Sequence, residues 1–156
     1  MRPGMGAKRP LRRRKFLALR ESEGATPMAQ GNSGDIKGSK AQTAHRLMMN
    51  PSTFKALSLA IHNLSVRELE LSSPRRLLTS VLQDDGRLLL GLSINELDAI
   101  CHADRLAGQV KLNIRVDSSV NDQLRQFREY AEQRLGRPVS VIEAVNACVY
   151  AMNDQV

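Results

Sequence analysis

Residues 110–116 alternate without a break between apolar and polar side chains. The apolar set is Val110, Leu112, Ile114 and Val116, and the polar set is Lys111, Asn113 and Arg115. Successive side chains of a β-strand point to opposite faces, so this pattern predicts a strand with one apolar and one polar face.

Two amphipathic helices are predicted after this strand. The first covers residues 119–135, follows the capping residues Asp117, Ser118 and Ser119, and ends at Gly136. The second covers residues 141–153 and begins with a capping box, because Ser140 and Glu143 have the spacing at which each side chain binds the other's backbone amide. Their apolar stripes are Val120, Leu124, Phe127, Ala131 and Leu135 in the first helix, and Val141, Val145, Cys148, Val149 and Met152 in the second.

The chain before the strand has helix signals of the same kind. A helix is predicted from the start signal Asn50-Pro51-Ser52, and a second one from Ser73-Pro74 to a stop at Gly86. A third begins at the capping box of Ser93 and Glu96 and extends to Gly108. The residues predicted to be buried are Phe54, Leu57, Ile61 and Leu64, then Leu77, Leu78, Val81 and Leu82, and finally Leu97, Ile100, Cys101 and Leu106.

Two short segments have no clear periodicity. Residues 44–49 are compatible with a short strand or with the lead-in to a helix, and residues 87–90 with a linker or a short strand. The predicted fold class is therefore mainly α with a short β-ribbon, in which the first half of the folded chain is helical.

Charge divides the chain into unequal parts. Residues 1–40 hold ten Lys and Arg against three acids, whereas the rest holds thirteen of each. We interpret residues 1–42 as a disordered basic tail whose arm, Arg12, Arg13, Arg14 and Lys15, contacts phosphates. Residues 43–108 form a helical segment, and residues 109–156 form the segment that contains the alternating strand.

Nothing in the sequence predicts catalysis, a cofactor or a metal site. Cys101 and Cys148 lie far apart among apolar residues and are interpreted as core residues. The three histidines, His45, His62 and His102, lack metal-ligand spacing. No phosphate loop, nucleophile elbow or paired-carboxylate motif occurs. No apolar stretch approaches membrane-spanning length, and we expect a cytoplasmic protein that is not an enzyme.

A lone strand needs a partner because its backbone groups must be hydrogen-bonded. With two helices behind it, the economical arrangement is an antiparallel ribbon made with a second strand, with the helices packed against its apolar face. The polar face of such a two-stranded ribbon has a width that fits the major groove of DNA.

The order polar–apolar–Asn–apolar–Arg in residues 111–115, the Gly136-Arg137 turn and the second capping box together resemble the ribbon-helix-helix family, the Arc/MetJ-type β-ribbon DNA readers. The resemblance covers about 45 residues. It implies that Lys111, Asn113 and Arg115 contact bases. It also implies phosphate contacts at the start of the second helix, from Arg137, Val139, Ser140 and Val141.

The source of the partner strand stays open at this point. Residues 44–85 repeat the same order in degenerate form, as in tandem ribbon-helix-helix proteins such as the TraY-type accessory proteins of conjugative relaxosomes, and would then make a pseudo-dimer within one chain. We favour the alternative, a homodimer joined through residues 110–116.

We expect sequence-specific binding of double-stranded DNA by a transcriptional repressor or regulator. Assembly of the protein into higher-order complexes on the DNA is compatible with this expectation. One alternative is an accessory protein of plasmid conjugation or partition. Another is an antitoxin-like protein whose residues 43–108 bind a partner protein. Neither the operator sequence nor the true start codon can be read from the chain.

Overall fold

The computed structural model describes residues 41–83 and 86–155, and the predicted basic arm lies outside these residues. Two strands, β1 (Gln42–Met49) and β2 (Val110–Asp117), form one antiparallel sheet. The helices are α1 (Pro51–Glu68), α2 (Pro74–Gln83), α3 (Arg87–Leu90), α4 (Ile94–Ile100), α5 (Ala103–Leu106), α6 (Ser118–Leu135) and α7 (Val141–Asn153). The described part of the chain is thus mainly helical with a two-stranded sheet, as predicted.

The partner strand of β2 comes from the same chain. Antiparallel pairing joins Gln42 to Asp117 at one end of the ribbon and Met49 to Val110 at the other. The preference for a second copy as the source of this strand was therefore wrong. The covalent connection explains the outcome, since residues 50–109 fold back and bring the two strands together without an association step.

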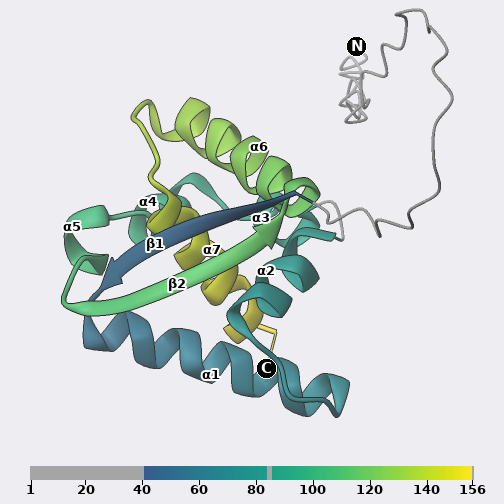
Figure 1. Cartoon of the computed structure of the whole chain (residues 1–156). Coiled ribbons are helices and arrows are strands. Elements are labelled where there is room, and N and C mark those ends of the chain that lie inside the picture. The colour runs from purple at the N-terminus through teal and green to yellow at the C-terminus, as the bar shows by residue number, and fades with distance from the viewer. Residues whose placement is uncertain (1–40, 84–85, 156) are drawn as a thin grey trace, which may run out of the picture. The chain divides into compact units, whose positions relative to one another are not determined.

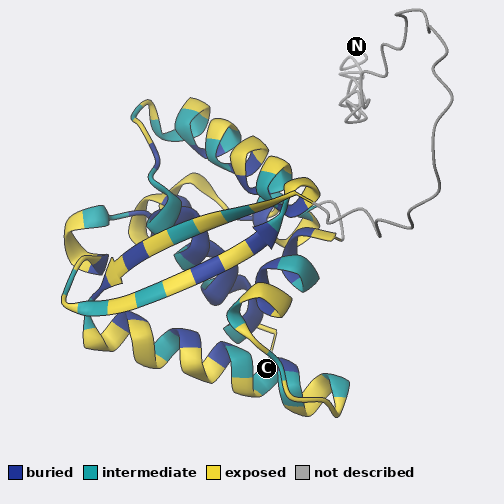
Figure 2. Ribbon diagram, in the orientation of Figure 1, coloured by how far each residue is buried: buried dark blue, intermediate teal, exposed yellow. Residues whose placement is uncertain are grey.

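The helices that the structure describes cover one face of the ribbon and leave the other uncovered (Figure 1). Helix α7 runs behind the strands, with α1 along one long side and α6 along the other. Both strands alternate between buried and exposed positions, as the colours of Figure 2 show. Leu47, Met49, Ile114 and Val116 are the buried inward residues, and they join the single hydrophobic cluster that both halves of the folded chain share.

The strand–helix–helix unit occurs twice, 67 residues apart. Helix α1 begins at Pro51 and α6 at Ser118, and α2 begins at Pro74 and α7 at Val141. The buried residues correspond at the same interval: Thr53, Leu57, Ala60 and Leu64 match Val120, Leu124, Phe127 and Ala131, and Leu77, Leu78, Val81 and Leu82 match Ala144, Val145, Cys148 and Val149. The two strands of the ribbon therefore each open one copy of a repeated strand–helix–helix unit.

The turns between the paired helices also correspond. Helix α6 ends at Gly136 in the left-handed conformation (φ 67°), and α1 ends at Leu69 with nearly the same backbone (φ 55°). Glycine adopts this conformation freely, whereas leucine does so at an energetic cost. Ser73 and Ser140 then open the second helix of each unit, since the Oγ of each accepts a backbone amide three residues later.

Several helix predictions hold and others need correction. The start signals at Asn50 and Ser73 and both capping boxes are present. Phe54 was predicted to be buried but is 39% exposed, because the buried stripe of α1 begins one residue earlier, at Thr53. Residues 87–90 form a short helix, neither a strand nor an irregular linker.

The predicted third helix is two helices, and Gly86 has a different role from the one expected. The helix from Ser93 ends at Ile100, and α5 follows it after Cys101 and His102. Gly86, expected to stop α2, has a left-handed backbone and precedes α3. The short helices α3 to α5 thus form the connection between the two strand–helix–helix units.

Gly108 permits a close crossing of the chain just before β2. A Cβ atom there would lie 2.3 Å from the Cα of Asn50 and 2.6 Å from the carbonyl oxygen of Met49. The backbones are also joined, since the amide of Asn50 donates to the carbonyl of Leu106 at 2.8 Å. We expect Gly108→Ala to lower the free energy of unfolding by about 2 kcal/mol, because backbone atoms must move apart.

Chemical denaturation of the full chain measures this effect. Gly91→Ala is the matched control, because its added Cβ would meet only ordinary contacts, the nearest at 3.4 Å. Both changes remove the same backbone freedom from the unfolded chain, so their difference isolates the steric cost at Gly108. Equal stability of the two variants would contradict the close crossing.

Candidate nucleic-acid interface

The middle of the uncovered ribbon face carries six exposed side chains, three from each strand, and the exposed Gln42 lies at the end of the same face. The six are Ala44, Arg46 and Met48 on β1, and Lys111, Asn113 and Arg115 on β2. The three residues predicted from sequence to contact bases thus lie side by side on an exposed face, as expected. Sequence reasoning missed the contribution of β1, above all Arg46.

Cross-strand pairing brings these side chains together. Arg115 lies opposite Ala44, Asn113 opposite Arg46, and Lys111 opposite Met48. Directly opposed residues in an antiparallel pair have Cβ atoms about 5 Å apart, so the six form one compact patch. This patch contains three cations and no carboxylate, although the chain from residue 41 onward has equal numbers of acids and bases.

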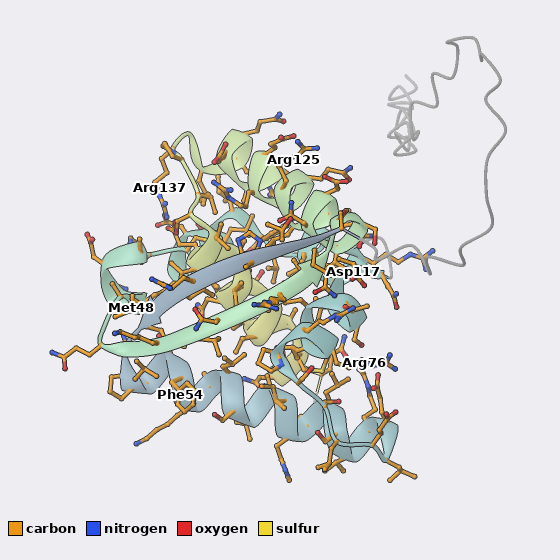
Figure 3. All side chains as sticks on the ribbon, viewed as in Figure 1. Met48, Phe54, Arg76, Asp117, Arg125 and Arg137 are labelled. Atoms are coloured by element: carbon orange, nitrogen blue, oxygen red, sulfur yellow. The ribbon has the colours of Figure 1, made fainter. Side chains whose placement is uncertain are left out.

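An acidic residue marks one end of the ribbon but is paired. Asp117 accepts from Arg75 of α2 at 2.8 Å, and this ion pair lies at the opposite end of the ribbon from Met48 (Figure 3). At the other end of the ribbon, Asn50 follows β1 and caps α1, since its Oδ1 accepts the amide of Thr53 at 2.7 Å. The patch is therefore bounded at one end by an ion pair with α2 and at the other by the residue that caps α1.

The inward face of β1 explains why its pattern was ambiguous. His45 points into the protein and lies 2.8 Å from Asn121, from its Nε2 to the Oδ1 of the amide. Met48, an apolar residue, points outward and is 40% exposed. A polar inward residue and an apolar outward one together obscure the alternation. The signal that finds this strand is its correspondence, 67 residues earlier, with β2.

At the start of α7 the four predicted phosphate contacts lie together. The amide of Ser140 donates to Glu143 Oε2 at 2.7 Å, and the amide of Val139 donates to Glu132 Oε1 at 3.0 Å. Both amides are thus already bound by carboxylates of the protein. Val141 is the first residue of the helix, where an amide has no acceptor within the helix, so it remains a donor that a phosphate can contact.

Arg137 is anchored in this same group of residues. Its guanidinium donates to Glu143 Oε1 at 2.9 Å and to the carbonyl of Cys101, while about a third of the side chain stays exposed. Burial alone would raise the pKa of Glu143, but hydrogen bonds from Ser140 and Arg137 together lower it. The bond to Glu143 likewise raises the pKa of Arg137. Glu143 is therefore a buried, charged centre around which Arg137 and Ser140 are fixed.

Glu143 is a residue that sequence reasoning used only as half of a capping box. Its side chain is 2% exposed, and it is one of two buried polar residues in the described part of the chain. No alternation or motif distinguishes such an acid from an ordinary exposed capping glutamate. Its burial arises because α4 and α5 pack against the start of α7.

The cysteines lie in the core, as predicted from their apolar neighbours. Cys101 and Cys148 are both buried and free. Burial raises the pKa of Cys101 to about 11 and that of Cys148 to about 12, so both thiols are protonated at neutral pH. Within residues 41–83 and 86–155, no group of three metal-ligating side chains is present.

Comparisons of this chain with protein-family models, with curated protein sequences and with solved structures found no match. Among the helices that the structure describes, none combines the length and apolar character needed to cross a membrane.

Proposed function

We propose that this protein binds double-stranded DNA in a sequence-specific manner by inserting the β1–β2 ribbon into the major groove. The observation that carries the proposal is the uncovered ribbon face with Arg46, Lys111, Asn113 and Arg115. A two-stranded ribbon fits this groove, where Arg and Lys pair with guanine and Asn pairs with adenine. The buried inward residues hold the ribbon rigidly, which keeps these side chains in register with successive base pairs.

The fold that we propose for this function is a tandem ribbon-helix-helix. In this interpretation β1, α1 and α2 take the place of one subunit, and β2, α6 and α7 take that of the other. The correspondence of buried positions at an interval of 67 residues supports it. In this interpretation the starts of α2 and α7 flank the ribbon, and we propose that Val141 and Arg137 on one side and Arg75 on the other contact phosphates.

The biological role that we propose first is that of a transcriptional repressor or regulator. A second candidate, an accessory protein of plasmid conjugation, is favoured by the intramolecular pairing of β1 with β2, the feature expected of TraY-type tandem proteins. The antitoxin-like alternative has no such support, because residues 43–108 contribute a strand and several helices to the shared core. A relaxase, partition or toxin gene beside the coding sequence distinguishes these roles.

Selection from a random pool of DNA duplexes tests the binding function directly. We expect enrichment of one sequence, bound at least about 10³-fold more tightly than a scrambled duplex of equal length at the same salt concentration. Fluorescence anisotropy with the full chain measures both dissociation constants. Equal affinity for the selected and the scrambled duplex would contradict sequence-specific binding.

A further inference from the structure

We infer that the DNA site of this protein is not palindromic and that a single chain binds it in one orientation. The inference rests on the proposed function and extends it to the kind of DNA site that is recognised. Its basis is the geometry of the ribbon: the two strands are related by an approximate two-fold axis, but the side chains on the outward face do not obey this symmetry.

The position of the axis follows from the strand register and the repeat. Arg46 pairs with Asn113, and these residues are also counterparts at the interval of 67. A pair that is both cross-strand and equivalent must lie on the two-fold axis. From Thr43 and Val110 to Met49 and Val116, the seven equivalent positions of the two strands share the same burial class, which confirms the correspondence.

On the axis, the two side chains have different chemistry. In a ribbon built from two identical chains, the same residue would occupy both positions and would meet both DNA strands alike. Here Arg46 favours the O6 and N7 atoms of guanine, whereas Asn113 favours N6 and N7 of adenine. The central base pairs are therefore read differently on the two sides.

The two ends of the outward face differ as well. One end holds Arg115 opposite Ala44, and the other holds Lys111 opposite Met48. Each end thus has one cation and one apolar residue, but the planar guanidinium of Arg binds guanine bidentately and the Lys ammonium acts as a compact point charge. The two halves of the DNA site therefore face different side chains.

The two flanks of the ribbon also differ, in the charge of the residues at the starts of α2 and α7. Arg75 and Arg76 lie at the start of α2, with side chains 46% and 56% exposed. The equivalent positions at the start of α7 are Ile142 and the buried Glu143. Phosphate contacts carry no base information, but unequal charge at the two flanks gives the chain a second reason to prefer one orientation.

One chain also supplies both strands of the ribbon, so no second copy is needed to complete it. The minimal DNA site should accordingly bind one chain. Two measurements on the full-length protein test these statements: the symmetry of the sequence selected from a random duplex pool, and the mass of the complex on the shortest duplex that retains full affinity, by analytical ultracentrifugation.

Variants with a symmetrical ribbon provide the sharpest comparison. The triple variant Ala44→Lys, Arg46→Asn, Met48→Arg gives both strands the outward residues of β2. The reciprocal variant Lys111→Ala, Asn113→Arg, Arg115→Met gives both strands those of β1. All six positions are exposed. We expect each variant to select a palindrome, different for the two, while the natural chain selects a sequence without two-fold symmetry.

The reciprocal pair keeps the test valid if like charges weaken one ribbon, since the first variant opposes cations at both ends of the ribbon and the second opposes them only on the axis. Leu71→Lys, at a position 97% exposed between α1 and α2, adds the same net charge as the first variant and should leave the selected sequence unchanged. A palindrome selected by the natural chain, or two chains on the minimal site, would overturn the inference and leave DNA binding intact. Selection of no sequence would overturn the proposed function and the inference together.

Discussion

Arg115→Ala and Asn113→Ala are each expected to weaken binding to the selected DNA site by about 1–3 kcal/mol, a loss of roughly 5- to 150-fold in affinity. Both side chains lie on the exposed face of β2, and under the proposed function each makes a bidentate contact with one base. Arg46→Ala should have an effect of the same size, although sequence patterns did not indicate this residue. Titration of a labelled duplex by fluorescence anisotropy measures the three losses.

The free energy of unfolding should change by less than about 0.5 kcal/mol in each variant, because surface substitutions outside special sites are nearly neutral. Arg87→Ala is the matched control: it removes an exposed cation from α3, an element that contributes nothing to the ribbon. It should alter specific affinity little. If Arg87→Ala weakened binding as much as Arg115→Ala, general charge and not the ribbon would explain the affinity.

Glu143→Ala should lower the free energy of unfolding by about 3–5 kcal/mol, the range found when one partner of a buried ion pair is removed. The change deprives Arg137 of its 2.9 Å ion pair and leaves the Ser140 amide and hydroxyl without their acceptor. Chemical denaturation of the full chain measures the loss. Glu129→Ala, which removes an exposed acid of α6, is the control and should be nearly neutral.

The acid sensitivity of the fold provides an independent measure of Glu143. Hydrogen bonds lower its pKa in the folded chain, so the folded state binds this proton less readily than the unfolded state does. Its contribution to stability is complete above about pH 5 and is lost as the pH falls through the ordinary glutamate range, near 4.3, toward the lower folded pKa. Glu143→Gln should flatten the stability curve in this range. An unchanged curve would show that folding does not lower the pKa of Glu143.

Local chemistry explains which elements the sequence could predict. Strand β2 alternates strictly, and the capping boxes at Ser93 and Ser140 consist of side chains that bind amides three residues away. Such signals require no knowledge of distant contacts. For the same reason the exposed positions of Lys111, Asn113 and Arg115 followed from the alternation alone.

The remaining features depend on contacts between distant parts of the chain. Strand β1 was ambiguous because His45 is accommodated on the inward face by Asn121, a residue 76 positions later. The burial of Glu143 depends on α4 and α5, and Arg137 binds the carbonyl of Cys101, 36 residues earlier. No periodicity within a short window contains this information, so Arg46 and the anchoring of Arg137 became visible only with the fold.

The presence of both strands in one chain has a consequence for how recognition can evolve. In a ribbon formed by two copies of a polypeptide, one codon change alters both strands, and both halves of a DNA site must adapt at the same time. Here a mutation at codon 46 leaves residue 113 unchanged, although the two side chains are paired across the axis. Under the proposed function, each half of the recognised sequence can therefore drift separately, and a new DNA target can be reached through single substitutions that retain half of the original contacts.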